Sequence, residues 1–433
     1  MLARGRFFYG WLMLSAVMLM TFSSAGARFS FGVFVHPMEE ALGWTLAELS
    51  GAAALNLLVA GLLRPVAGIL ADRWGPRAVA LGGLCLAALA LVLTSLAAEL
   101  WQFYLAYGVL LAAGYAGASP VTVTTLVSNW FVARRALALS IGSTGSALGE
   151  LLIVPLAALV IGIIGWQMTF RAMAAFIVLV VLPASLALIR NRPSELGLQP
   201  LGGTLRTARG DTLDGRRALS LGQALWLGDF WRLAFGFFVC GFTMSFASTH
   251  FVPFAMEMEF EPMVAAGALG LVGGFSIIGS LATGLLADRL GRKNVLAAVY
   301  FLRGASFAVL MHAHHNPLAL YLGAFLLGIS WTATTPLTSS ITADRCGLTS
   351  LGTIFGTMFT VMPLGSAVGA ALGGVLHDLS GGYDGSLIIS SAAGLLAAVV
   401  VAGVREPRAA PLAPTHPAPA ALGRATTSSP GSA

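Results

Sequence analysis

Five ionisable side chains lie inside long apolar segments of the chain, namely Arg28, Arg64, Glu150, His250 and Arg303. A charge is costly in an apolar environment, so an ionisable residue there is by default a candidate functional residue. The guanidinium of an arginine keeps its charge and matches a carboxylate with two hydrogen bonds. A buried carboxylate is stable only when it is protonated or lies beside a cation. These residue types favour recognition of a small anion, with a proton as a second participant.

Arg28 and Glu150 are predicted to lie at similar depths in their segments. Arg28 comes about 20 residues into the first apolar segment, in its outer half, and small residues flank it. Glu150 follows Gly149, about 15 residues into the fifth segment. We expect Arg28 either to bind a substrate anion or to form a structural pair with Glu150. Glu150 is accordingly either a proton-coupling acid or the fixed partner of Arg28.

The other three ionisable residues have simpler interpretations. His250 lies near the outer end of the seventh segment and is either a gating or proton-sensing residue or a hydrogen-bonded structural one. Arg64 precedes Pro65 about eight residues before the inner end of the second segment, so we expect its side chain to reach the inner interface or a neighbouring loop. Arg303, near the inner end of the ninth segment, is predicted to be structural.

The composition shows which elements must hold these side chains. The chain has 433 residues, of which 57% are hydrophobic and only 10% are charged. A soluble protein of this length keeps more charge at its surface. Apolar runs long enough to cross about 30 Å of hydrocarbon as helices recur from residue 8 to residue 404. The 52 glycines suit close contacts between membrane helices. The sequence predicts an all-α, multi-pass membrane protein.

We predict twelve transmembrane helices in two six-helix halves. The expected spans are residues 8–34, 45–71, 78–98, 101–129, 135–164, 168–189, 230–256, 263–287, 295–312, 317–342, 351–376 and 386–404. Of the 24 Lys and Arg residues, 19 fall in or beside segments on the side of the N-terminus, which predicts that both termini are cytoplasmic. The excess of Arg over Lys suggests a GC-rich bacterial source, and hence the bacterial inner membrane.

The predicted domains follow from these spans. Residues 1–190 form the N-terminal half and residues 229–405 the C-terminal half. Residues 191–228 are a basic cytoplasmic linker that is expected to lie near anionic lipid. Residues 406–433 are rich in Pro, Ala, Ser and Thr and are expected to be a disordered tail.

One charged stretch occurs twice, 216 positions apart. It reads Gly-Ile-Leu-Ala-Asp-Arg-Trp-Gly-Pro-Arg from Gly68 and Gly-Leu-Leu-Ala-Asp-Arg-Leu-Gly-Arg-Lys from Gly284. At the same offset Pro37 matches Pro253, Tyr115 matches Trp331, Pro120 matches Pro336, Gly149 matches Gly365, and Gly165 matches Gly381. Helix-breaking and close-contact residues therefore lie at matched depths. The pattern predicts two halves in parallel repeat, with a binding site between them near the midplane.

The repeated stretch is predicted to form a cytoplasmic gate. Its charged residues are Asp72, Arg73 and Arg77 in the first copy and Asp288, Arg289 and Arg292 in the second. We expect them to hold the inner gate closed through charge pairs and contacts with helix ends, and to bind no substrate.

With the pattern Gly-x-x-x-Asp-Arg-x-Gly-x-Arg/Lys after the second and eighth spans, the chain resembles the major facilitator superfamily over nearly its full length. Within that superfamily it is similar to monocarboxylate transporters and bacterial oxalate–formate exchangers. Four short stretches carry this closer resemblance: Phe8-Tyr9-Gly10-Trp11 with Phe31-Gly32-Val33-Phe34, residues 130–138, residues 192–198, and His250-Phe251-Val252-Pro253.

The resemblance implies where the substrate binds. It places Arg28 as a substrate-facing cation on the first helix, and Tyr115 and Trp331 around a central cavity in the fourth and tenth helices. Asn56, Thr332, Thr334 and Thr335 are expected to offer hydrogen bonds there. The family's arginine on the eighth helix is replaced by Ser280, and no acid lies nearby.

The sequence predicts no enzyme, cofactor or metal site, because it contains no nucleotide-binding loop, no metal-ligand cluster and no catalytic-triad spacing. We expect a monomeric secondary transporter that moves a small organic anion by alternating access, coupled to protons or to a counter-substrate. Its expected partners are that anion and membrane lipid, and nucleic acid is not among them. Because the eighth-helix cation is missing, efflux of an amphipathic compound is a second possibility. A non-transporting receptor on the same fold is a third.

Overall fold

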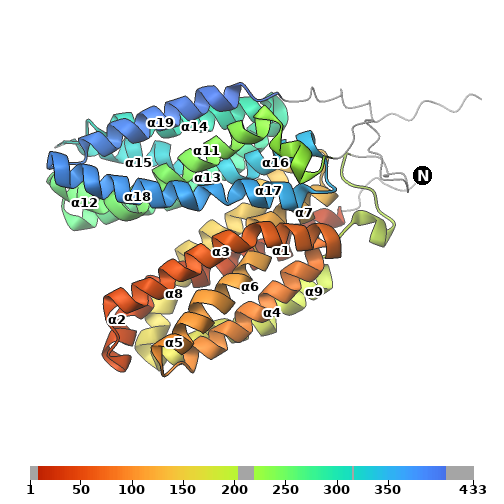
Figure 1. The fold of residues 1–433 in the computed structure, drawn as a ribbon, viewed down its shortest axis with the longest axis horizontal. Helices are drawn as coiled ribbons and strands as arrows, with labels where there is room; N and C mark the ends of the chain where they lie inside the picture. The colour runs from red at the N-terminus through yellow and green to blue at the C-terminus, as the bar shows by residue number, and fades with distance from the viewer. Residues whose placement is uncertain (1–7, 203–218, 315, 406–433) are drawn as a thin grey trace, which may run out of the picture.

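The computed structural model describes residues 8–202, 219–314 and 316–405, which form two helical halves (Figure 1). Within these residues, eleven helices are long and apolar enough to cross a membrane. One of them spans Arg135–Leu188, 54 residues, and Gly165 interrupts it with φ 78° and ψ 166°. That conformation suits glycine and turns the chain sharply, so this helix comprises two spans. The twelve predicted spans are confirmed. The predicted tail and residues 203–218 of the basic linker lie outside the described residues.

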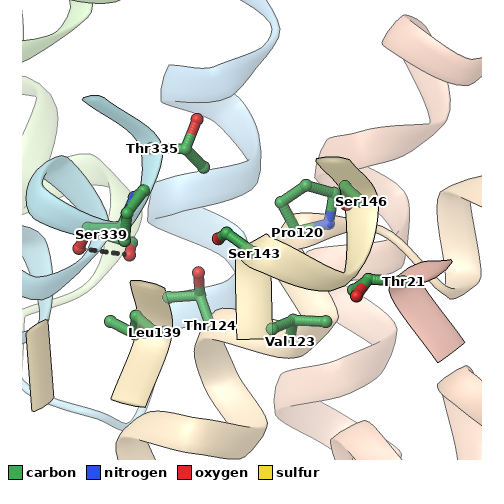
Figure 2. Close-up of a pocket in the computed structure, with 10 residues that line it drawn as sticks. Thr21, Pro120, Val123, Thr124, Leu139, Ser143, Ser146, Thr335 and Ser339 are labelled. Carbon is green, nitrogen blue, oxygen red and sulfur yellow. Dashed lines mark hydrogen bonds between the residues drawn. The ribbon is translucent and has the colours of Figure 1, made fainter. Parts of the chain in front are cut away.

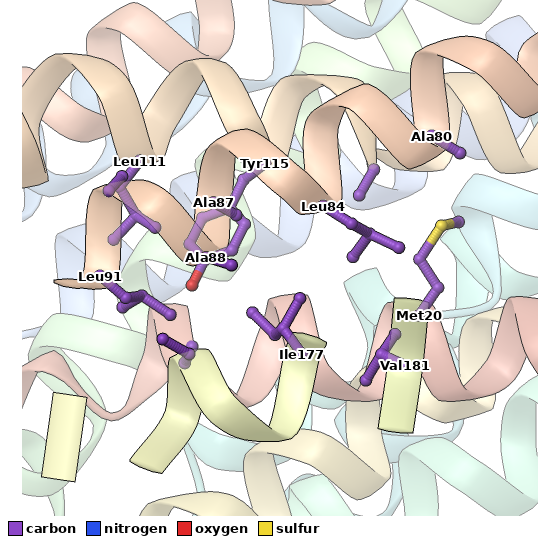
Figure 3. Close-up of a cluster of buried hydrophobic side chains, with 14 of the residues drawn as sticks. Met20, Ala80, Leu84, Ala87, Ala88, Leu91, Leu111, Tyr115, Ile177 and Val181 are labelled. Atoms are coloured by element: carbon purple, nitrogen blue, oxygen red, sulfur yellow. The ribbon is translucent and has the colours of Figure 1, made fainter. Parts of the chain in front are cut away.

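The N-terminal half contains the first six spans. Its helices are α1 (Tyr9–Phe29), α2 (Phe31–Leu42), α3 (Leu46–Trp74), α4 (Pro76–Ser95), α5 (Leu100–Phe103), α6 (Ala112–Gly117), α7 (Pro120–Trp130), α8 (Arg135–Phe176) and α9 (Leu182–Leu188), with π-helical segments at η1 (Tyr104–Leu111) and η2 (Ile177–Val181). Its apolar core is a cluster of buried side chains drawn entirely from residues 13–189. Figure 3 shows part of this cluster, where Leu84 and Leu91 face Ile177 and Val181.

The C-terminal half contains the other six spans. Its helices are α11 (Gly228–Ser245), α12 (Phe251–Glu257), α13 (Pro262–Leu290), α14 (Arg292–Leu310), α15 (Pro317–Trp331), α16 (Thr334–Cys346), α17 (Leu351–Phe359), α18 (Val361–Ser380) and α19 (Asp384–Ala402), with a π-helical segment at η4 (Phe246–His250). Two short elements, η3 (Pro193–Leu196) and α10 (Leu221–Leu225), lie between the halves in sequence.

Several spans are broken near their middles, and the breaks have local causes. The fourth and tenth spans break before Pro120 and near Pro336, which the repeat pairs. Proline has no N–H to donate and clashes with the preceding turn. The eleventh span breaks at Thr360, before Pro363. The corresponding part of α8 runs on as helix because Ala147 stands where the second half has Pro363. The halves are therefore similar but not symmetric.

The two halves meet at the end where α1 begins and diverge toward the opposite end (Figure 1). At that inner end α3 packs against α17, and α8 packs against α13. Gly68 and Gly352 bring α3 and α17 into backbone contact, because a Cβ on Gly68 would lie 2.1 Å from the Gly352 carbonyl oxygen. Since the inner end is the predicted cytoplasmic side, the structure is one in which the inner contacts are formed.

Candidate functional site

A cavity of about 220 Å³ lies between the two halves. Small-molecule sites are concave, mostly apolar pockets with a few placed polar groups. This cavity fits that description. Its charged and polar lining residues are Thr21, Ser24, Arg28, Asn56, Arg64, Tyr115, Ser119, Ser143, Ser146, Glu150, Thr332, Thr334 and Thr335, and its larger apolar ones are Phe29, Met244, Trp331 and Met362.

The helix breaks position much of this lining. Arg28 is in the last turn of α1, directly before the break at Ser30. Tyr115 precedes the break between α6 and α7, and Trp331 ends α15. Met362 follows the break between α17 and α18. At each break the helix ladder is incomplete, so side chains from sequence-distant segments converge on one space near the middle of the spans.

Arg28 lies in this cavity with a guanidinium that the protein does not satisfy. Its side chain is half-buried. Its charge interacts with Glu150 and with the polar groups of Tyr107 and Tyr115, and its guanidinium carbon lies 5.7 Å from the ring centre of Phe29. Among the described residues, no hydrogen bond or ion pair joins Arg28 to another side chain. Its five N–H donors are therefore available to a ligand.

Glu150 lines the same cavity from α8 and is exposed to it. It is the only carboxylate among the described lining residues. The direct pair with Arg28, one of the two alternatives for these residues, is not formed in this conformation. The two charges interact, but no contact ion pair joins them in the part of the chain that the structure describes. Arg28 is thus available to a bound anion, and Glu150 is available to a proton.

The four uncharged residues predicted to bind substrate, Asn56, Tyr115, Trp331 and Thr335, also line the cavity. The Asn56 amide donates to the Tyr107 carbonyl oxygen at 2.7 Å, which fixes its orientation. Tyr115 is 8% exposed, and its buried hydroxyl has no hydrogen-bond partner. Its side chain forms part of the cavity wall.

Buried Arg303 supports the Trp331 end of α15, as the structural prediction for it implies. It is fully buried, and its guanidinium donates to the Ser330 and Trp331 carbonyl oxygens, the latter at 3.0 Å. It also lies 2.9 Å from the Cys240 sulfur. These carbonyls come at a helix end, where backbone acceptors lack intrahelical partners, and the cation satisfies them.

Arg64 is where the sequence prediction is wrong. Its side chain does not reach the inner interface: it is 8% exposed and lines the cavity together with Arg28. The reason is that α3 packs directly against α17, which leaves the guanidinium between the cavity and that helix. The guanidinium carbon lies 4.4 Å from the ring centre of Phe359.

The structure places His250 outside the cavity. Its Nε2 lies 3.1 Å from the Ala370 carbonyl oxygen and its Nδ1 lies 3.5 Å from the Tyr383 hydroxyl. Both partners belong to the C-terminal half, and His250 is buried among them. These contacts match the structural alternative for this residue, and a proton-coupling role for it remains a prediction.

A small pocket of about 20 Å³, the size of one water molecule, continues the cavity. Hydroxyl groups from both halves surround it: Thr21, Thr124, Ser143 and Ser146 from the first, Thr335 and Ser339 from the second (Figure 2). The Ser339 hydroxyl donates to the Pro336 carbonyl oxygen at 3.0 Å.

At the inner end, Asp72 of the N-terminal half forms hydrogen bonds with the C-terminal half. Its carboxylate accepts hydrogen bonds from the backbone N–H of Gly352 at 2.9 Å, and from the backbone N–H and the hydroxyl of Thr353, both at 2.7 Å. These donors belong to the first turn of α17, where unpaired N–H groups and the helix dipole favour an anion. The contact is of the predicted helix-end type.

Asp288 makes the matching contact in the other direction. Its carboxylate accepts from the N–H of Ala136 at 3.3 Å and of Leu137 at 3.0 Å, in the first turn of α8. Asp344 on α16 adds a network: it pairs with Arg292, and with Arg135 across the halves at 2.5 Å. Asp344 and Arg135 were not predicted, because neither belongs to the repeated stretch.

Three of the four predicted arginines of the repeated stretch, Arg73, Arg77 and Arg289, form none of the expected charge pairs among the described residues. Arg77 bonds to the Leu186 carbonyl oxygen and to Asn191, within or next to its own half. Arg73 and Arg289 are exposed. Among the described residues Asp72 has no ion pair with Arg73 or Arg77. Only Arg292 of the predicted basic residues pairs with its own aspartate, Asp288, at 3.5 Å.

The family model described as Major Facilitator Superfamily matches residues 17–284 and 270–429, most of the chain. The chain belongs to the major facilitator superfamily. It is thus a multi-pass membrane protein and a secondary transporter, and not an enzyme.

Relatives and solved structures agree with this family. The "Uncharacterized MFS-type transporter YcxA" of Bacillus subtilis is 28% identical over 86% of this chain and 90% of its own length. "Monocarboxylate transporter 13" of Rattus norvegicus is 25% identical over 89% of this chain and 86% of its own length. A crystal structure of the transporter FucP in the outward conformation superposes with a TM-score of 0.70 over 91% of this chain and 99% of that chain, at 18% identity. The last shows the shared fold alone.

Proposed function

We propose that this transporter moves a small organic monoanion, such as a monocarboxylate, by alternating access. The observation that supports it is the unsatisfied Arg28 guanidinium in the central cavity. The charged groups of the cavity are Arg28, Arg64 and Glu150. With Glu150 ionised, two cations and one carboxylate leave one net positive charge, which a monoanion neutralises. A buried charge without compensation is unfavourable, so the cavity favours such a substrate. Relatives named monocarboxylate transporters support the same class.

The substrate's remaining part is proposed to be apolar. Phe29, Met244, Trp331 and Met362 line the cavity opposite or beside the charged groups. Methionine side chains are flexible and adapt to irregular shapes. The C-terminal half supplies only uncharged residues to the described lining, so the carboxylate would face the first half and the apolar part the second.

Glu150 is proposed to couple transport to a proton. It is the one titratable carboxylate in the cavity lining that the structure describes. With Glu150 protonated, the net charge of the cavity rises by one, and an anion binds more tightly. Proton and anion would therefore bind cooperatively and cross together, as linkage requires. The alternative is exchange of the anion for a counter-substrate without protons. The proposed location is the bacterial inner membrane.

The test is uptake by purified protein in proteoliposomes. Radiolabelled lactate, pyruvate, benzoate and oxalate would be offered with and without an inward pH gradient. We expect saturable uptake of at least one monocarboxylate, accelerated by an acidic outside. If the pH gradient has no effect on uptake, the result would favour exchange over proton symport. No flux with any acid, together with hypersensitivity of a deletion strain to amphipathic drugs, would refute the proposal in favour of efflux.

A further inference from the structure

Two prolines create an unusual junction between the halves beside the cavity. Proline at position i has no N–H for the carbonyl of residue i−4. Pro65 in α3 thus leaves the Gly61 carbonyl without its helical donor, and Pro363 in α18 leaves the Phe359 carbonyl in the same condition. A freed carbonyl in a membrane span must find another partner.

Each freed carbonyl lies near a donor of the opposite half. The Thr360 hydroxyl lies 3.4 Å from the Gly61 carbonyl oxygen, although its closer acceptor, at 3.0 Å, is the Gly356 carbonyl oxygen of its own half. An Arg64 N–H donates to the Phe359 carbonyl oxygen at 3.5 Å. Arg64 also lies over the Phe359 ring, a cation–π contact. Backbone contact surrounds the pair, since a Cβ on Gly356 would lie 2.7 Å from the Arg64 carbonyl oxygen. Arg64 is therefore part of the contact that joins the halves.

The same guanidinium also faces the cavity. Arg64 lines it beside Arg28, and the charges of the two arginines interact. Within the described residues no carboxylate pairs with Arg64. The distance of 3.5 Å to the Phe359 oxygen is long for a hydrogen bond, so the present bond is weak. A carboxylate is a stronger acceptor for an arginine than a neutral carbonyl.

We propose that Arg64 is a second anion-binding residue whose guanidinium exchanges between the Phe359 carbonyl and the substrate. When a carboxylate enters, it binds Arg28 and draws Arg64 from α17, which weakens the contact between the halves and permits the inner end to open. This inference rests on the proposed function. It assigns the second substrate-binding cation to Arg64, in the second span of the N-terminal half. The matching position in the C-terminal half is the uncharged Ser280.

The test measures binding and conformation in the same variants. Binding of radiolabelled benzoate, lactate and pyruvate to purified protein gives a dissociation constant for the acid that binds best. Spin labels at positions 74 and 290 report the opening of the inner end by their separation, because Trp74 and Leu290 are 69% and 62% exposed at the inner ends of α3 and α13. The variants are Arg64→Gln, Arg64→Lys and Phe359→Leu. Arg171→Gln is a control, because Arg171 follows the turn at Gly165, is exposed and donates to the Ser95 hydroxyl at 3.1 Å within its own half.

The exchange predicts a specific pattern. Arg64→Gln should weaken acid binding at least about tenfold, as expected for loss of a hydrogen bond to a charged group. The acid affinity of Arg64→Lys should lie between those of Arg64→Gln and the wild type, because lysine keeps the charge but not the planar guanidinium. Phe359→Leu should bind the acid within about twofold, since Phe359 does not line the cavity, but should show a larger separation without acid. Added acid should lengthen the separation in wild type and not in Arg64→Gln.

Three results would overturn the inference. If both Arg64 variants bind the acid with the wild-type dissociation constant, Arg64 is not part of the binding site, although the proposed function would stand. An equal loss of acid binding in Arg64→Gln and Phe359→Leu would show that Arg64 acts only by stabilising the fold. If Arg64→Gln does not fold, Arg64→Lys is compared with Phe359→Leu in its place. A wild type that binds none of the acids would refute the proposed function, and the inference with it.

Discussion

The aspartate at the end of α3 offers the most specific prediction about transport kinetics. Asp72 accepts three hydrogen bonds from Gly352 and Thr353 in the opposite half, at 2.7 to 2.9 Å. Asp72→Asn keeps one acceptor oxygen but replaces the other with an amide N–H that faces a donor. It also removes the charge that complements the α17 N-terminus.

The magnitude follows from these contacts. A hydrogen bond to a charged group contributes about 1.5 to 3 kcal/mol, and a charge at a helix end adds about 0.3 to 1 kcal/mol. Loss of one charged bond and of the dipole term destabilises the inner-closed state by about 2 to 4 kcal/mol. A change of 2 kcal/mol shifts the ratio of inner-closed to inner-open states by about 30-fold. The cavity lies elsewhere, so the affinity for substrate should change far less than the turnover.

Two measurements test this. Spin labels at positions 74 and 290 should show a larger population at long separation in Asp72→Asn, and turnover in proteoliposomes should slow because the return to the closed inner end is harder. Arg73→Gln is the matched control, because Arg73 is adjacent, exposed and outside this contact. Thr353→Val should lose part of the same contact, and its effect should not add fully to that of Asp72→Asn. An unchanged separation with a pure loss of affinity would show the reasoning to be wrong.

Three further predictions follow from the same structure. Glu150→Gln should abolish the acceleration of uptake by an acidic outside, because glutamine stands in for the protonated acid at every pH; a pH response equal to wild type would rule out Glu150 as the coupling group. Gly68→Ala should open the inner end, since the new Cβ would lie 2.1 Å from the Gly352 carbonyl oxygen; label separations identical to wild type would contradict this. Arg303→Ala should lower the unfolding free energy by about 3 kcal/mol or more, because the Ser330 and Trp331 carbonyls lose their donor; a thermal denaturation midpoint equal to that of wild type would be the contrary result.

The sequence determined the spans, the repeat and the position of the cavity. Hydropathy is a local property of each segment, and a helix satisfies most backbone groups of a membrane span within the segment itself. The offset of 216 positions placed Tyr115 with Trp331, and both line the cavity. Arg28, Asn56, Glu150 and Thr335 were likewise found from depth, residue type and family resemblance.

Only the tertiary structure decided which way the remaining charged side chains face. Arg64 has the sequence context of a residue that reaches the interface, yet it lies between the cavity and Phe359. Asp344 and Arg135 form a bond across 209 positions that no repeat pairs. His250 bonds within its own half instead of facing the substrate space. Depth along a span is set by the sequence of that span, whereas the direction of a side chain depends on which surface of another helix packs against it.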